Sequence, residues 1–326
     1  MKEASANSDV LESGGNACTI CGADSPVSLD AVTPAQLEAA WKLMGVSLSQ
    51  EALGELVGVE RVHLWECRNC GFAYSDLEYA GSGAFYEELQ RQLSNYYPAN
   101  STEFSRAVNF AREFQLNDVL DVGCGEGGFL DLARKAGLRT YGVELNAKAA
   151  AVARSKGHEV YDELLEKIVA RKNHPRFDFV TLWQVLEHVP DPVGFLKQCA
   201  LFLKPSGYLA LAVPSESAIK TLCPYNPHCW PPHHVTRWRV KDLRRAGEQA
   251  GLKFLSGGHD PANMYHARSM WELHNKLAPA FGYQPRPGGK LLPKIVAAGA
   301  TRLWATKLLP EWGPSTFAFY RVAQTS

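Results

Sequence analysis

Two carboxylates flank a glycine-rich loop at a spacing suited to one elongated ligand. The apolar segment 118–122 contains Asp121 and runs into GCGEGG at 123–128. Glycines let the backbone approach a ligand closely, and the helix that follows such a loop offers free N–H groups. Asp121 suits an ammonium group, whereas Glu144, at the end of the next apolar segment, suits two ribose hydroxyls. An amino acid joined to a nucleoside meets both requirements, so the pattern predicts a site for S-adenosylmethionine.

The same loop has two other interpretations. Gly123, Gly125 and Gly128 also fit the dinucleotide fingerprint G-x-G-x-x-G, which is a weak signal by itself. A tight turn beside an incidental acid is the structural alternative. The coincidence of the turn with both carboxylates favours S-adenosylmethionine.

Four cysteines form two matched pairs. Cys18 and Cys21, and then Cys67 and Cys70, each stand in a C-x-x-C-G pattern. In each pair two thiolates can face one ion, and four thiolates make a closed tetrahedral zinc site. A redox dithiol and four unrelated cysteines are the alternatives. Because a closed site leaves no coordination position open, we expect a structural zinc ion.

Three histidines are candidates for the chemistry. His188 follows one predicted strand, and His233 and His234 follow the next in a proline-rich loop. We expect all three at the carboxyl edge of the sheet, where ligands bind, as catalytic base or acceptor anchor. A structural role is the alternative for each. Cys223, Cys229, His228 and His233 could in principle bind a second metal, but Pro224 and Pro227 favour a plain loop.

The elements that must position these residues follow from the hydrophobic pattern. From residue 117 short apolar runs alternate with helical stretches, which is typical of a parallel sheet with crossover helices. Strands are predicted near 118–122, 140–143, 158–161, 178–182, 207–213, 252–256 and 316–322. The predicted organisation is a disordered tail at 1–16, a zinc-binding module with a helical insert at 17–76, a helical cap at 77–116, a core at 117–257 and 315–326, and a basic helical insert at 258–314.

Three stretches of the chain resemble the class I S-adenosylmethionine-dependent methyltransferases: VLDVGCGEGGFL, YGVELN and FDFVTLWQVLEHVPDPVGFLKQCALFLKPSGYLALAVPS. The resemblance implies an α/β fold with a seven-stranded, Rossmann-like, mostly parallel sheet whose last strand is antiparallel. It also implies that Leu145 packs on adenine, Asp162 meets the adenine amine and Gln184 lies near the sulfonium. The expected cofactor contacts are Asp121, Gly123, Cys124, Gly125, Gly127, Glu144, Leu145, Asp162 and Gln184. In architecture, the cysteine module followed by this core resembles zinc-bearing bacterial sugar C-methyltransferases.

Charge and hydropathy indicate location and partners. Lys plus Arg equals Asp plus Glu, at 34 each, so no general attraction to nucleic acid is expected. The N-terminus lacks the pattern of a signal peptide, charges interrupt the apolar segment 291–310, and we expect a cytoplasmic protein. Between 273 and 310 the chain has basic residues and no acid, which favours a substrate cap and an anionic acceptor. Peripheral membrane contact through 290–309 and a solvated basic helix are the alternatives.

These observations predict an S-adenosylmethionine-dependent methyltransferase for a small, anionic metabolite such as a nucleotide-linked sugar. The methylated atom, carbon, oxygen or nitrogen, is left open. One alternative is a protein or nucleic-acid methyltransferase that holds its macromolecule with the zinc module. The other is a non-catalytic binding protein that keeps the cofactor fold.

Overall fold

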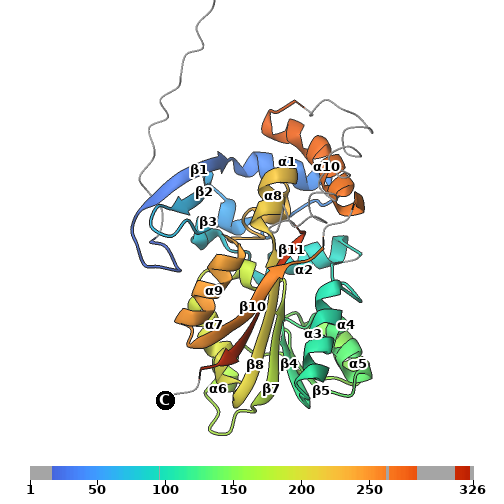
Figure 1. Ribbon diagram of the computed structural model, residues 1–326. Coiled ribbons are helices and arrows are strands. Elements are labelled where there is room, and N and C mark those ends of the chain that lie inside the picture. The colour runs from blue at the N-terminus through green and yellow to red at the C-terminus, as the bar shows by residue number, and fades with distance from the viewer. Residues whose placement is uncertain (1–16, 95, 262–263, 285–312, 324–326) are drawn as a thin grey trace, which may run out of the picture.

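A seven-stranded, mostly parallel sheet organises the part of the chain that the structure describes (Figure 1). This computed structural model describes residues 17–94, 96–261, 264–284 and 313–323. The strand order is β10-β11-β8-β7-β4-β5-β6. The bounds are β4 Asp118–Val122, β5 Arg139–Val143, β6 Glu159–Tyr161, β7 Phe177–Trp183, β8 Leu203–Pro214, β10 Leu252–His259 and β11 Ser315–Val322.

The direction of the strands confirms the predicted fold. Strand β11 lies between β8 and β10 and is antiparallel to both. The pairs among β8, β7, β4, β5 and β6 are parallel. Each of the seven strands overlaps one of the predicted apolar segments.

Helices cover both faces of this sheet because successive strand residues point to opposite sides. Val119 and Phe179 pack in one core cluster with α3 and α4, whereas Leu120 and Val180 pack in another with α6, α7 and α9. Figure 1 shows α5 on the same side as α3 and α4. The bounds are α3 Thr102–Glu113, α4 Gly128–Lys135, α5 Ala147–Ser155, α6 Leu165–Val169, α7 Pro192–Leu201 and α9 Val240–Gln249.

A smaller antiparallel sheet carries the cysteine pairs and borrows its last strand from the C-terminal half of the chain. Its order is β1-β2-β3-β9, with bounds β1 Pro26–Val32, β2 Val62–Cys67, β3 Ala73–Ser75 and β9 Thr236–Arg237. Phe72 and Tyr74 pack in the same core cluster as Trp238 and Leu243. The two sheets therefore share one continuous apolar core.

Short helices surround the smaller sheet and the upper end of the large one in Figure 1. Helix α1 (Pro34–Leu43) begins with a capping box in which Thr33 and Gln36 bond each other's backbone N–H. The others are α2 Gly83–Gln92, α8 Glu216–Leu222 and α10 Met264–Leu277, with 3-10 turns η1 Gly54–Leu56, η2 Leu77–Tyr79, η3 Leu186–His188, η4 Pro227–Cys229 and η5 Ala278–Phe281.

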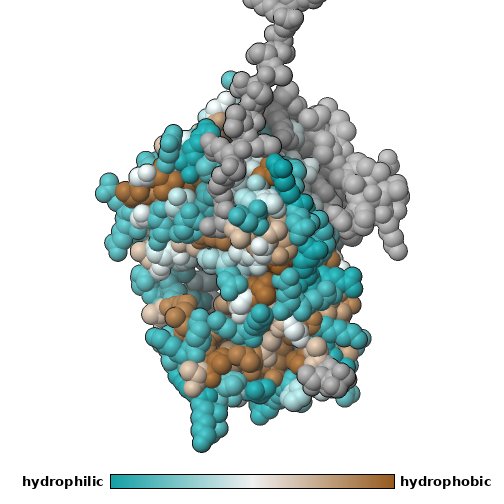
Figure 2. All heavy atoms as spheres, turned by 90° about the vertical axis from the view of Figure 1, so that its left-hand side faces the viewer, coloured by the Kyte–Doolittle hydropathy of each residue, from teal (hydrophilic) through white to brown (hydrophobic). Residues whose placement is uncertain are grey.

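Several predicted features lie outside the described residues. They are the tail at 1–16, the segment 290–309 and most of the insert at 258–314, of which α10 and η5 are described. Among the described helices, none combines the length and apolar character needed to cross a bilayer. Figure 2 views the side that carries α7 and α9, where apolar patches alternate with hydrophilic ones. That mixture is typical of an ordinary protein surface.

Candidate functional site

A cavity of about 850 Å³ opens where strands β4, β5 and β7 end. Ligands of open α/β sheets bind at this edge because the loops there diverge to both faces. Most of the predicted site residues line it: Asp121, Gly123, Cys124, Glu144, Leu145, Gln184, His188, His233 and His234. Gly125 and Gly127 belong to the same loop but are not among the lining residues, and Asp162 lies elsewhere.

The glycine loop needs its glycines for two physical reasons. Gly123, Gly125 and Gly127 have φ values of 76°, 53° and 83°, in the left-handed region that side chains disfavour. A Cβ atom at Gly123 would lie 2.6 Å from Val185 Cγ2, and one at Gly125 would collide with the Tyr97 ring. Gly127 is the N-cap of α4, so the loop delivers the chain directly to a helix N-terminus.

Replacing Gly128 by alanine should destabilise the protein, because a Cβ there would collide with the carbonyl oxygen of Pro98, a backbone atom that cannot rotate away. We expect the free energy of unfolding to fall by about 1–3 kcal/mol, as for other overpacked sites. The matched control is Gly54→Ala, where a Cβ meets nothing within 4 Å. Urea unfolding of both variants measures the difference, and equal stabilities would contradict the close approach of residue 98 to the loop.

The two predicted carboxylates lie at the cavity, and both are held by hydrogen bonds. Asp121 is 1% exposed and accepts a 2.7 Å hydrogen bond from Thr181 Oγ1. Glu144 accepts hydrogen bonds from the backbone N–H groups of Gly125 and Asn146, at 2.8 and 2.7 Å. Burial raises the pKa of both carboxyl groups. Buried carboxylates that face a cavity favour a ligand with a cation and hydroxyl donors, which fits an amino acid joined to a nucleoside.

The other residues that were expected to contact the cofactor differ from one another in burial and in hydrogen bonding. Leu145 lines the cavity and is 59% exposed, so its side chain is free to contact a ligand. Gln184 has φ 55° and donates from Nε2 to Glu103 Oε1 at 2.9 Å. Cys124 is buried, and burial raises the pKa of its thiol.

Asp162 is not brought into the cavity. It follows the edge strand β6, and its carboxylate forms a 3.1 Å ion pair with Arg154 on α5. Its side chain is 53% exposed. The expectation that Asp162 meets the adenine amine therefore has no support in its position.

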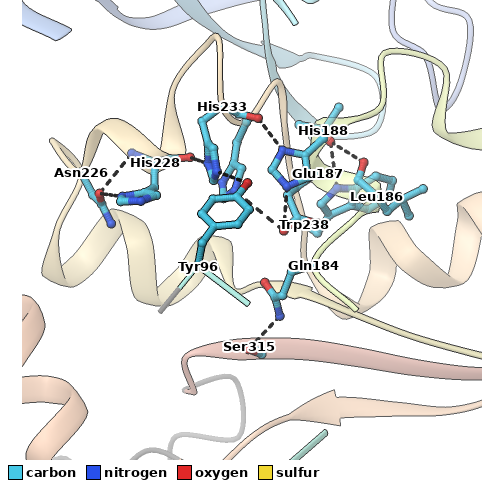
Figure 3. A network of polar contacts seen from close by, with 12 residues as sticks. Tyr96, Gln184, Leu186, Glu187, His188, Asn226, His228, His233, Trp238 and Ser315 are labelled. Atoms are coloured by element: carbon cyan, nitrogen blue, oxygen red, sulfur yellow. Dashed lines mark hydrogen bonds and ion pairs between the residues drawn. The ribbon is translucent and has the colours of Figure 1, made fainter. Parts of the chain in front are cut away.

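Figure 3 shows His188 and His233 near His228, and all three line the cavity. His234 lines it beside them. The His188 and His233 rings lie 4.8 Å apart between centroids, and those of His233 and His234 lie 4.4 Å apart. His188 Nδ1 donates to the His233 carbonyl oxygen at 2.6 Å, and His233 Nδ1 donates to the His228 carbonyl oxygen at 2.9 Å. A carbonyl oxygen only accepts, so in the neutral rings the proton is on Nδ1 and the lone pair is on Nε2.

The Glu187 carboxyl group is buried against these rings. It is 1% exposed, and neither carboxylate oxygen has a hydrogen-bond partner. Its Oε1 lies 3.9 Å from His188 Nε2 and 3.8 Å from His234 Nε2. Burial raises the pKa of Glu187 and lowers that of His188 to about 4. Burial likewise lowers the pKa of His233 and His234, so the rings are neutral near pH 7.

The four paired cysteines converge beside the smaller sheet, where Cys67 is the last residue of β2 and the other three lie in loops. Cys18 Sγ lies 3.6 Å from Cys70 Sγ, and Cys21 Sγ lies 3.5 Å from Cys67 Sγ. All four sulfur atoms lie within 4.8 Å of one another. A tetrahedral zinc ion with bonds of about 2.3 Å holds its sulfurs roughly 3.8 Å apart, so the cluster has the dimensions of such a site.

Three cavity residues were missed by the sequence analysis. Glu103 lies in the first turn of α3 and accepts a hydrogen bond from Gln184, and burial raises its pKa. Asn146 caps α5, and its amide contacts the Gln90 side chain on α2. The N-cap position of Asn146, directly after a predicted strand, was a usable signal. Glu103 and Gln90 reach the cavity through tertiary packing, for which the sequence has no local signal.

Comparisons with known proteins agree with this geometry. Residues 86–256 match the family model described as a methyltransferase domain. The ubiquinone biosynthesis O-methyltransferase of Albidiferax ferrireducens is 35% identical over 105 residues, which are 30% of this chain and 42% of that protein. The protein of the same name from Bordetella avium is 29% identical over 193 residues, 54% of this chain and 78% of that one. The chain spans less than half the length of the first of these relatives.

Solved structures show weaker likeness. An S-adenosylmethionine-dependent methyltransferase from Clostridium acetobutylicum is 11% identical, with 73% of this chain and 98% of that chain covered and a TM-score of 0.47. A methyltransferase of this kind from Archaeoglobus fulgidus is 16% identical, with 73% of this chain and 99% of that chain covered and a TM-score of 0.43. Likeness at this level carries no functional argument. The family match to residues 86–256 extends over more than half of the 326 residues, and the chain therefore belongs to the methyltransferase-domain family.

Proposed function

We propose that the protein is an S-adenosylmethionine-dependent methyltransferase that acts on a hydroxyl group of a small molecule. The observation that carries the proposal is the shared cavity, in which a glycine loop between two buried carboxylates opens toward a group of neutral histidines. Asp121 would bind the ammonium group of the cofactor, and Glu144 would bind its ribose. The backbone of the glycine loop would contact the part of the cofactor that joins these two groups. S-adenosylmethionine, when bound, supplies an electrophilic methyl group on a sulfonium.

The histidines would serve the acceptor. An oxygen or carbon nucleophile must lose a proton to react, and a neutral imidazole within reach can accept it. His188, His233 and His234 remain our candidates for the base or the acceptor anchor. Their position supports this role, since they line the same cavity as Asp121 and Glu144. Tyr86 and Tyr96 also line the cavity, where their hydroxyl groups are hydrogen-bonded to His188 and His233. This position supports a role in excluding water.

The charge of the cavity favours an uncharged acceptor over the anionic one expected from composition. Among the described lining residues there is no lysine or arginine, whereas six are acidic: Glu87, Glu103, Asp121, Glu126, Glu144 and Glu187. Three basic side chains that precede the insert form ion pairs elsewhere: Arg237 with Glu216, Arg239 with Asp242 and Arg244 with Glu248. The relatives named as ubiquinone biosynthesis O-methyltransferases also favour oxygen as the methylated atom.

We further propose that the cysteine cluster holds one structural zinc ion. The sulfur spacing supports it, and so does the matching backbone of the two pairs. Gly22 and Gly71 have φ values of 73° and 72°, and their N–H groups bond the carbonyl oxygens of Cys18 and Cys67. Lys241 Nζ would lie 3.3 Å from a Cβ at Gly71, so positive charge lies close to the thiolates. Cysteine thiolates are the ligands that structural zinc prefers.

Calorimetry on the full chain tests the proposed cofactor. We expect binding of S-adenosylhomocysteine and no binding of NAD. Glu144→Ala should weaken the binding by about 1–3 kcal/mol, because the buried ribose hydroxyls of the ligand would be left without their acceptor. Asp162→Ala is the matched control and should leave the affinity unchanged, since that side chain lies outside the cavity. Binding of NAD without a response to S-adenosylhomocysteine would overturn the proposal.

A further inference from the structure

Three imidazoles in the cavity are close enough to share one ion. Each of His188, His233 and His234 has a ring nitrogen that could bind an ion, and these three nitrogens lie within 4.8 Å of one another. Nitrogens bound to one zinc ion at about 2.0–2.1 Å in a tetrahedral site lie roughly 3.4 Å apart. The nitrogens therefore have to approach one another by at most about 1.4 Å.

The hydrogen bonds of two of these rings prepare Nε2 for a ligand. His188 and His233 each donate from Nδ1 to a backbone carbonyl oxygen, at 2.6 and 2.9 Å. Metal-binding histidines make this bond with the nitrogen that does not bind the metal, because it fixes the tautomer and orients the ring. The hydroxyl of Tyr96, 3.2 Å from His233 Nε2, is the contact that must yield to an ion.

A buried carboxyl group lies beside the rings. Oε1 of Glu187 lies within 3.9 Å of Nε2 of both His188 and His234, and both of its oxygens lack hydrogen-bond partners. Lone pairs of a carboxylate and a neutral imidazole repel each other unless a proton or a cation lies between them. The described lining of the cavity contains no lysine or arginine that would fill this role.

We propose that His188, His233 and His234 bind a divalent transition-metal ion, separate from the cysteine cluster, with Glu187 as the adjoining carboxylate. Imidazole suits Zn²⁺ and the neighbouring first-row metals, and three protein ligands leave one position open toward the cavity. An oxygen of the acceptor can occupy that position, where the ion favours its deprotonated form. The bound ion would then take the place of a histidine base, because an Nε2 lone pair that binds metal cannot accept a proton. This role in the reaction rests on the proposed function, whereas binding of the ion does not.

Metal titration of the full-length protein tests the site. Dialysis against a chelator removes weakly held metal, and elemental analysis counts the zinc that remains. Co²⁺ is then added and followed by calorimetry and visible absorption. We expect one equivalent of Co²⁺ with weak visible bands and no thiolate charge-transfer absorption. The double variant His188→Gln/His234→Gln should lose at least about a hundredfold in Co²⁺ affinity, since it lacks two of three ligands.

His228→Gln is the matched control, because His228 lines the same cavity but lies outside the cluster of possible ligands. It should retain Co²⁺ affinity within about threefold, because the substitution keeps the backbone carbonyl oxygen that accepts from His233 Nδ1. The proposal is overturned if the parent binds no Co²⁺, if the double variant binds it as tightly, or if the control loses as much. S-adenosylhomocysteine binding by the same samples separates this result from the proposed function. If the parent protein binds Co²⁺ but not S-adenosylhomocysteine, only the proposed function is refuted. If it binds S-adenosylhomocysteine but takes up no Co²⁺, only the metal site is refuted.

Discussion

Replacing Cys67 by serine should release the zinc ion that we propose for the cysteine cluster, and it should unfold much more than the cysteine module. Cys67 ends β2 and is 1% exposed, and its loss leaves three thiolates. Zinc binding contributes folding free energy, about 10–16 kcal/mol in isolated zinc-finger peptides, which is an upper bound here. Cys67 packs in the same core cluster as Trp238, Leu243 and residues of the large sheet. We therefore expect a loss of several kcal/mol in stability and weaker S-adenosylhomocysteine binding as well.

Elemental analysis and thermal unfolding of Cys67→Ser measure these effects. The matched control is Cys199→Ser, which makes the same atomic change at a fully buried cysteine outside the cluster. The control should retain zinc and lose only about 1–3 kcal/mol, the cost of burying a poorly paired hydroxyl. If Cys67→Ser kept its zinc and unfolded at the same temperature as the control, the cysteine cluster would not be a metal site.

The joint core behind this prediction was not apparent from the sequence. The pattern separated a cysteine module at 17–76 from a core that begins at 117, because composition changes between them. The structure pairs Tyr74 on β3 with Thr236 on β9. Hydrogen bonds between segments so distant in the chain leave no periodic signal, and a strand of two residues is too short to be recognised.

The features that the sequence did predict are local ones. The seven strands are short apolar runs between turns, and their pattern is independent of what packs on them. The glycine loop is predictable because left-handed φ values select glycine. Asp162 shows the opposite case. Its position after a strand suggested the cofactor, but the nearby Arg154 on α5 binds its carboxylate outside the cavity.

The acceptor end of the cavity illustrates the same limit. His188, His233 and His234 were identified from their places after two strands, and the structure brings them together. Glu187 acquires its importance only from burial, since an acidic residue beside a histidine is unremarkable in a sequence. The oxygens of Glu187 lack hydrogen-bond partners because no donor side chain lies near enough. Only the three-dimensional structure shows this.

Substituting the histidine that removes the acceptor's proton should lower kcat by about 10²–10⁴, the usual contribution of a general base. The geometry favours His188 and His234 over His233. Nε2 of each lies beside Glu187, whereas Nε2 of His233 already accepts from Tyr96. The affinity for S-adenosylhomocysteine should be nearly unchanged in all three alanine variants, because the carboxylates that serve the cofactor lie elsewhere in the cavity. Loss of an acceptor anchor alone should raise KM instead.

An acceptor for these measurements comes from a screen of S-adenosylhomocysteine release, with phenols and other neutral hydroxyl compounds in one set and nucleotide-linked sugars in the other. The acidic lining predicts turnover in the first set. Single-turnover kinetics on the alanine variants then isolates the chemical step, with His228→Gln as the control for a general disturbance of the loop. Partial recovery of a variant with added Zn²⁺ would identify a metal ligand, since a lost base cannot be restored by an ion. Three variants within about threefold of the parent would exclude a histidine base, and the proton would then have to leave through Glu187 or through an acceptor that needs no base because proximity suffices.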